Sequence, residues 1–120
     1  MNKTVFIICH CYMAFGELRR SGNIANLLQQ EGANVHLITN ESNKMRQDFF
    51  ENTSVNWHFY LDGQENIKKD DDTSLFFTLK TLCETHSPDI VVYDSYPFCK
   101  KQYIRVSYTN TPFIFLNFYN

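Results

Sequence analysis

The sequence has no excess of charge of either sign and no long hydrophobic run. Its formal net charge is −2 at pH 7, and the charged residues are interspersed without a polybasic stripe. A domain that binds nucleic acid usually carries a basic face, so nucleic acid is not expected as a partner. The apolar run VFIIC is shorter than the roughly 7 to 15 residues of a signal peptide core, and no run approaches the roughly 18 of a membrane span. We therefore expect a cytoplasmic protein, with at most peripheral contact at the inner face of a membrane.

The sequence also lacks a recognisable metal motif. Cys9, His10 and Cys11 are adjacent, and thiolate and imidazole are good zinc ligands. In a strand, however, Cys9 and Cys11 share one face while His10 points to the other, and no CxxC or HxxxH pattern occurs elsewhere. We expect no metal and no cofactor, and cysteines that stay reduced as free thiols.

Glycine is scarce where a nucleotide-binding loop would need it. The loop AFGELRRSG has no lysine and no GKS or GKT ending, so it is not a P-loop. Only Gly16 and Gly22 are present, six residues apart, which does not match the fingerprint of a dinucleotide-binding turn. This loop therefore does not predict nucleotide binding.

Segments with strand-like and helix-like hydrophobic periods alternate along the chain. Gly32 stands where the C-terminal cap of the first helix belongs, and Ser87 with Pro88 stops the third helix. The length of 120 residues suits a single domain spanning residues 1–120. This order predicts an α/β, Rossmann-like open parallel sheet of about five strands with helices on both faces. Strands are expected at 4–10, 34–39, 55–61, 89–94 and 113–118, and helices at 17–31, 42–52 and 73–86.

Right-handed crossovers place every strand-to-helix loop along one edge of such a sheet, where open α/β sheets bind ligands. The first of these loops brings together His10, Glu17, Arg19 and Arg20 at the start of a helix. Free backbone N–H groups and arginine side chains suit an anion such as a phosphate or carboxylate. The alternative is that both arginines are ordinary exposed residues of the first turn, and that His10 is packed rather than a base.

The second loop at this edge follows the strand at 89–94 and begins DSYPF. Asp94 lies beside the hydroxyl groups of Ser95 and Tyr96. An acid at this place can orient a sugar hydroxyl or act as a base, or it can cap the next turn. The sequence leaves these alternatives open.

Two segments, GELRRSGNIANLLQQEGANVHLIT and PDIVVYDSYPFCKKQ, together resemble the N-terminal half of GT-B glycosyltransferases of the MurG-like group, in particular predicted bacterial glycosyltransferases. Nucleotide-sugar hydrolases of the PseG kind are related to this family. In that family the N-terminal Rossmann-like domain binds the acceptor, and a second domain of similar fold binds the nucleotide-sugar donor. The likeness covers nearly the whole chain in the order of its elements, but only two motifs match.

The resemblance implies roles for individual residues of this chain. Where the family places a histidine after the loop glycine, this chain has Glu17, whose ordinary pKa of about 4.3 would need burial to serve as a base near neutrality. The implied catalytic residues are His10, Glu17 and Asp94. The implied substrate-binding residues are Gly16, Arg19, Arg20, Ser95, Tyr96, Lys100, Lys101 and Gln102, with lysines where the family has arginines.

The chain ends at Asn120, just after the fifth expected strand, so we expect the donor-binding half to come from another domain or subunit. The resemblance then implies a sugar or glycolipid acceptor and a reaction in the synthesis of cell-surface polysaccharide or glycolipid. The isolated chain is expected to transfer no sugar without a donor-binding partner, and to dock to one or to associate with itself. The alternative from another class is a non-catalytic, flavodoxin-like interaction module.

Overall fold

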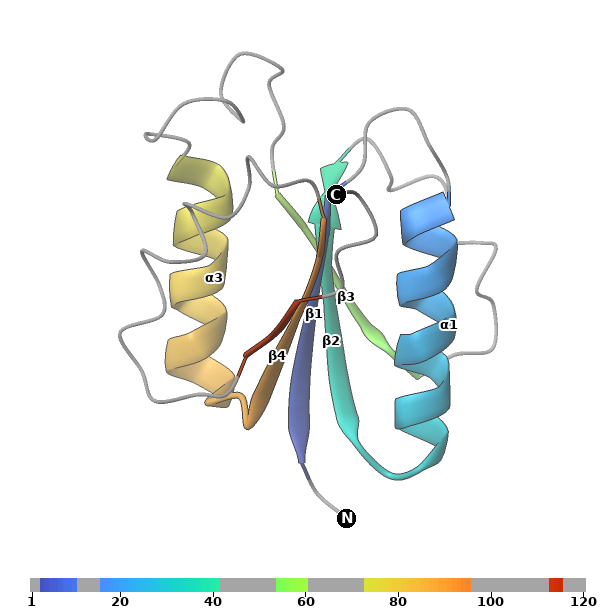
Figure 1. Ribbon diagram of the computed structural model, residues 1–120. Helices are drawn as coiled ribbons and strands as arrows, with labels where there is room; N and C mark the ends of the chain where they lie inside the picture. The colour runs from blue at the N-terminus through green and yellow to red at the C-terminus, as the bar shows by residue number, and fades with distance from the viewer. Residues whose placement is uncertain (1–2, 11–15, 42–53, 61–72, 96–112, 116–120) are drawn as a thin grey trace.

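The computed structural model describes residues 3–10, 16–41, 54–60, 73–95 and 113–115 (Figure 1). Within these ranges strands and helices alternate along the chain. They are β1 (Thr4–His10), α1 (Gly16–Gln30), β2 (Asn34–Asn40), β3 (Asn56–Tyr60), α3 (Thr73–His86), β4 (Ile90–Ser95) and β5 (Phe113–Phe115). The predicted helix at 42–52 lies outside the described residues, as do the last three residues of the strand predicted at 113–118.

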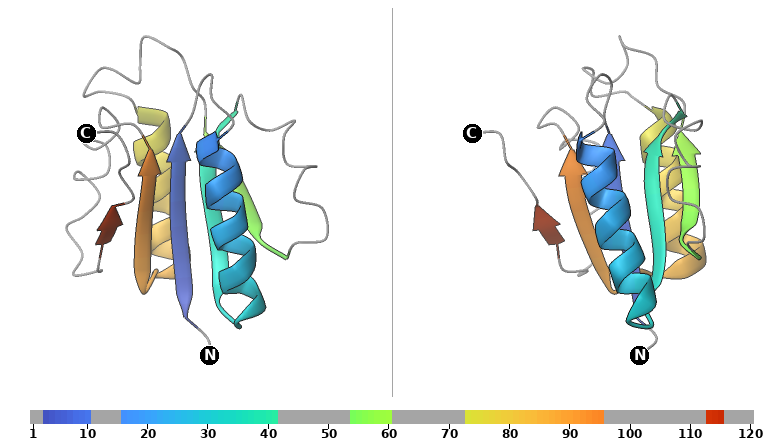
Figure 2. Two further views of the ribbon diagram at one scale, coloured as in Figure 1. Left: turned by 45° about the vertical axis from the view of Figure 1, so that its right-hand side comes forward. Right: turned by 90° about the vertical axis from the view of Figure 1, so that its right-hand side faces the viewer.

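The strands form one parallel sheet in the order β3-β2-β1-β4-β5. Helix α1 covers one face of this sheet and α3 covers the other (Figures 1 and 2). The prediction of an α/β protein with a parallel sheet between helices is therefore confirmed. The three residues of β5 pair with Val91, Val92 and Tyr93 of β4.

Each face of the sheet has its own apolar core, because successive strand residues point to opposite faces. Beneath α1 the buried side chains are Val5, Ile7, Cys9, Leu18, Ala25, Val35, Leu37, Val55 and Val92. Beneath α3 they are Phe6, Ile8, Ile38, Tyr60, Leu79, Leu82, Val91 and Tyr93. The central strand β1 contributes to both cores, which explains its nearly unbroken apolar sequence.

Both helices end where the sequence predicts. Gly32 follows α1 with a φ of 96°, its N–H donates to the Gln29 carbonyl at 3.0 Å, and the N–H of Ala33 donates to the Leu28 carbonyl at 3.1 Å. This is the Schellman pattern, in which a residue with positive φ satisfies the last carbonyls of a helix. Ser87 follows α3 with a φ of 44°, directly before Pro88, so the helix cannot continue.

No helix in the described part of the chain is both long enough and apolar enough to cross a membrane.

Candidate functional site at the carboxyl edge of the sheet

The ends of β1 and β4 bring two of the predicted site residues together. In the pairing register His10 lies opposite Ser95, and Cys9 lies opposite Asp94. Helix α1 starts at Gly16 with its first turn at the same edge, beside the carboxyl ends of the strands (Figure 1). The backbone thus gathers the strand ends and the first turn of α1, as expected for strand-to-helix loops of a parallel sheet.

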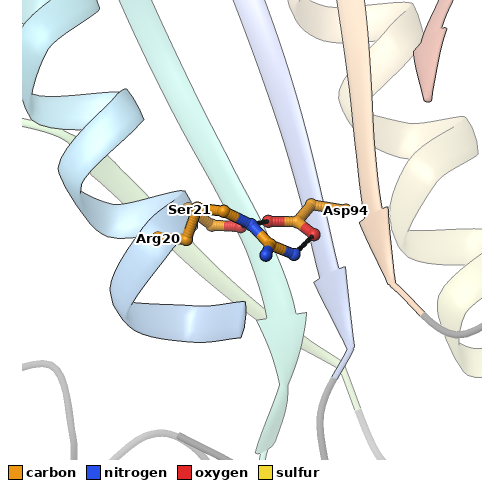
Figure 3. Close-up of polar contacts among 3 residues, drawn as sticks. All are labelled: Arg20, Ser21 and Asp94. Carbon is orange, nitrogen blue, oxygen red and sulfur yellow. Dashed lines mark hydrogen bonds and ion pairs between the residues drawn. The ribbon is translucent and has the colours of Figure 1, made fainter. Parts of the chain in front are cut away.

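A partly buried ion pair links α1 to β4 at this edge (Figure 3). The Arg20 Nε donates to Asp94 Oδ2 at 3.1 Å, and its Nη2 donates to Asp94 Oδ1. The Ser21 hydroxyl donates to Asp94 Oδ2 at 2.7 Å. The Asp94 side chain is 1% exposed, whereas that of Arg20 is 32% exposed and reaches the surface. Both carboxylate oxygens therefore accept hydrogen bonds, and the guanidinium is held in a bidentate geometry.

The sequence of α1 explains how a helix comes close enough to make these bonds. Ser21, Gly22 and Ala25 are all small and buried against the sheet, so the helix backbone can approach it closely. Leu18 is fully buried on the same stripe and fixes the rotation of the helix. Residue 20 then lies at the flank of the buried stripe, where a long arginine side chain can reach Asp94 and still contact water.

The electrostatic reason for the pairing is the burial of the Asp94 carboxylate. An isolated ionised carboxylate away from water is very unfavourable unless it is paired and hydrogen-bonded. Arg20 supplies the opposite charge and two donors, and Ser21 supplies a third donor. As a result, the Arg20 guanidinium has a fixed orientation at the edge of the sheet, because the Asp94 carboxylate holds it with two hydrogen bonds. Catalysis by Asp94 itself stays a prediction.

The two neighbouring arginines are not equivalent. Arg19 is exposed, and Arg20 is the one that pairs with Asp94. The alternative that both arginines are ordinary exposed residues therefore does not hold for Arg20.

Other predicted site residues lie outside the described part of the chain. They are Tyr96, Lys100, Lys101 and Gln102. Gly16 is described as the first residue of α1, while for His10, Glu17 and Ser95 only the backbone position is described. Their roles stay predictions.

Sequence reasoning missed Ser21 as a partner of Asp94. Ser21 lies on the apolar stripe of α1, with Leu18 and Ala25 at helical spacing on either side of it. A polar residue on such a stripe has to find a hydrogen-bond partner in the core, and this signal could have pointed to the nearest strand-end acid.

A cluster of histidines on the α3 face of the sheet was also missed. The Nδ1 of His36 in β2 lies 2.8 Å from the Nε2 of His58 in β3, and the His86 ring of α3 lies 4.2 Å from the His36 ring, measured between centroids. The last turn of α3 lies toward the amino ends of the strands, at the edge of the sheet opposite their carboxyl ends (Figure 1). The signal in the sequence was a histidine at an apolar-stripe position of the helix expected at 73–86, together with histidines inside two consecutive expected strands.

Among the residues that the structure describes, no three His, Cys, Asp or Glu side chains are arranged so that they could hold a metal ion. No family model and no curated protein matches this chain. The likeness to GT-B glycosyltransferases therefore rests on the two segments at 16–39 and 88–102 and on the order of the elements.

Proposed function

We propose that the chain is the acceptor-binding, Rossmann-like half of a GT-B glycosyltransferase, which transfers a sugar from a nucleotide sugar only together with a donor-binding domain or subunit. The strand order β3-β2-β1-β4, with β5 beside β4, supports the Rossmann-like class and a sheet of five strands. Such sheets bind ligands at their carboxyl edge. The protein would then act in the cytoplasm on a sugar or glycolipid acceptor, with peripheral membrane contact when the acceptor is lipid-linked.

The observation that carries this proposal is the fixed guanidinium of Arg20 at the carboxyl edge. The bidentate bond to Asp94 restricts the rotamers of a flexible side chain before any ligand arrives. A preorganised arginine near a helix N-terminus suits phosphate or carboxylate groups, or sugar hydroxyl groups, that must be held in one orientation. In this proposal Asp94 positions Arg20, whereas His10 and Glu17 remain the candidates for contact with the reacting hydroxyl.

We also propose that this polypeptide alone transfers no sugar. A GT-B reaction holds the donor pyrophosphate and the acceptor hydroxyl in one closed cleft. Positioning of this kind is worth on the order of 7 to 11 kcal/mol in well-oriented cases. Half of a cleft cannot supply that positioning, so the chain needs a partner surface.

One observation favours a second candidate, a non-catalytic flavodoxin-like interaction module. The Asp94 carboxylate is 1% exposed and both of its oxygens are engaged, which is what a purely structural tie between helix and strand would look like. In this candidate the edge would bind no sugar phosphate.

A titration with glucose 1-phosphate and N-acetylglucosamine 1-phosphate, followed by amide NMR shifts, separates the two candidates. The glycosyltransferase proposal expects shifts in residues 10–22 and 94–98 and their reduction in Arg20→Lys, which keeps a cation beside Asp94 but loses the bidentate geometry. Lys80→Ala is the matched control, because Lys80 is an exposed cation on the other helix. The absence of shifts in these two segments would favour the interaction module.

An activity assay tests the need for a partner. The purified 120-residue chain is incubated with a panel of nucleotide sugars, and its mass in solution is measured in the same buffer. Turnover that appears only after a donor-binding chain is added supports the proposal. Turnover by a strict monomer contradicts it.

A further inference from the structure

Three histidine rings from three different elements meet on the α3 face of the sheet. The ring centroids of His36 and His58 are 5.1 Å apart, and those of His36 and His86 are 4.2 Å apart. His36 is 3% exposed, and the Phe6 ring of β1 packs edge-on against it at 5.4 Å. The cluster therefore joins β2, the edge strand β3 and the last turn of α3.

A chain of hydrogen bonds fixes which nitrogen of each ring carries the proton. It starts at the Val35 carbonyl, which can only accept, so the Asn56 side-chain nitrogen at 3.1 Å must be the amide NH2 group. The same nitrogen donates to Asn34 Oδ1 at 3.2 Å. Asn34 Nδ2 is therefore a donor as well, and it faces His36 Nε2 at 3.4 Å. His36 Nε2 must then be the bare, accepting nitrogen.

The rest of the chain follows from this assignment. A neutral His36 with a bare Nε2 carries its proton on Nδ1, which donates to His58 Nε2 at 2.8 Å. His58 Nε2 is thus also bare, so a neutral His58 carries its proton on Nδ1. Protonating His36 at Nε2 would set an N–H against the Asn34 NH2 group. Protonating His58 at Nε2 would set the new N–H of His58 against the Nδ1–H of His36. Either proton breaks a hydrogen bond of the chain.

Among the described residues, the surroundings offer little compensation for a charge on these rings. Strands β1, β2 and β3 contain no Asp, Glu, Lys or Arg. The charged residues of α3 are Lys80 and Glu84, both exposed, and its Cys83 packs against the core on this face. Asp89, which follows α3, binds the backbone N–H of Thr4 at 2.8 Å, and Lys3 before β1 is exposed. Burial, and to a smaller extent the neighbouring His86 and His58, lowers the pKa of His36 to about 4. Burial, and to a smaller extent His86, also lowers the pKa of His58.

We propose that His36, His58 and His86 form a pH-sensitive latch, which holds β3 and the last turn of α3 against β2 at neutral pH and releases them in acid. When a proton enters the cluster, a hydrogen bond of the chain is lost and the rings repel one another. Strand β3 lies at the edge of the sheet, and His86 is the last residue of α3. Strand β3 and the last turn of α3 can therefore detach while β1, β4 and the Arg20–Asp94 pair stay in place.

The direction of the pH effect follows from proton linkage. The ordinary pKa of histidine is about 6.5. Below that pH, His36 binds a proton in the unfolded chain but stays neutral in the folded chain, so unfolding becomes more favourable. Stability from the cluster is complete above about pH 6.5 and is lost progressively toward pH 4. For His36 alone, the ratio of folded to unfolded protein falls about 30-fold between pH 7.5 and pH 5.

The first test reads the imidazole nitrogens of the full chain by NMR, which needs no variant. At pH 7.5 the proposal expects His36 and His58 in the form protonated at Nδ1, and His36 titrating far below the same residue in urea. Amide protection factors, which correct for the slower intrinsic exchange in acid, are expected to fall at pH 5 first in β3 and residues 83–86, ahead of β1 and β4. A proton on His36 Nε2, an ordinary titration, or a uniform fall of the protection factors would overturn the latch.

The second test uses His36→Gln. A glutamine amide can also accept from Asn34 and donate to His58, but it does not titrate, so it replaces the polarity without the switch. The about 30-fold fall in the ratio of folded to unfolded protein that His36 contributes between pH 7.5 and pH 5 should disappear in this variant, measured by urea unfolding at both pH values. If His36→Gln folds poorly, His58→Gln, at a less buried site, is measured in the same way. Glu84→Gln, an exposed change in the last turn of α3 near His86, should keep the wild-type fall in the folded-to-unfolded ratio. An equal fall in all the variants would contradict the proposal.

Discussion

Arg20 of α1 and Asp94 of β4, 74 residues apart in the sequence, form a bidentate ion pair at the carboxyl edge of the sheet. The pair ties the first helix to the fourth element of the sheet order, at the point where ligands bind in folds of this kind. The same contact thus bears on stability and on the proposed site.

Replacing Arg20 with Ala is expected to lower the free energy of unfolding by about 3 kcal/mol, because it leaves the buried Asp94 carboxylate without its counter-charge. Arg19→Ala is the matched control, since Arg19 is exposed and its removal should change stability by less than about 0.5 kcal/mol. Urea unfolding at pH 7 measures both. Equal effects of the two substitutions would show that the ion pair adds nothing to stability.

Ser21→Ala removes one hydrogen bond to the same carboxylate and is expected to cost about 1.5 to 3 kcal/mol, the usual range for bonds to charged groups. Ser21 and Arg20 both donate to Asp94 Oδ2, so their effects should not add in the double variant. The double-mutant cycle is measured by urea unfolding. Strict additivity would mean that the serine and the arginine act on Asp94 independently.

Gly32→Ala is expected to lower the free energy of unfolding by about 1 kcal/mol, because Gly32 has a φ of 96° that an alanine side chain opposes. The control is Gln30→Ala in the last turn of α1, an exposed helical position where alanine is tolerated within about 0.5 kcal/mol. Thermal unfolding compares the two variants. A glycine substitution without effect would argue against the Schellman end of α1.

Most of the described fold could be predicted from hydrophobic periodicity. The run at 4–10 is apolar enough to be covered on both faces. The structure places it at the centre of the sheet, between the strands predicted at 34–39 and 89–94. The ends of both helices were predictable because Gly32 and Ser87-Pro88 are local signals. Local chemistry sets these features, so no knowledge of distant contacts is needed.

The site was predictable only in its position. The topology rule brings the ends of β1 and β4 and the start of α1 to one edge, but it does not say which arginine turns inward. That choice depends on the closeness of α1 to the sheet, which the small side chains of Ser21, Gly22 and Ala25 permit only in the packed structure. The histidine cluster was missed for the same reason. His36, His58 and His86 are 22 and 28 residues apart along the chain, and only the register of β2 with β3 and the packing of α3 bring their rings together.

The last prediction concerns the thiol of Cys83. Burial, and to a smaller extent the negative charge of Glu84, raises the pKa of this thiol above its ordinary value. Because only the thiolate is nucleophilic, Cys83 should react with iodoacetamide at pH 7.5 more slowly than a free cysteine. Cys9 is fully buried beneath α1 and should also be protected in the folded chain. Peptide mapping after a timed reaction measures both sites, and the chain unfolded in urea is the control in which both should react at the ordinary rate. Modification of Cys83 as fast in the folded chain as in urea would contradict its packing between α3 and the sheet.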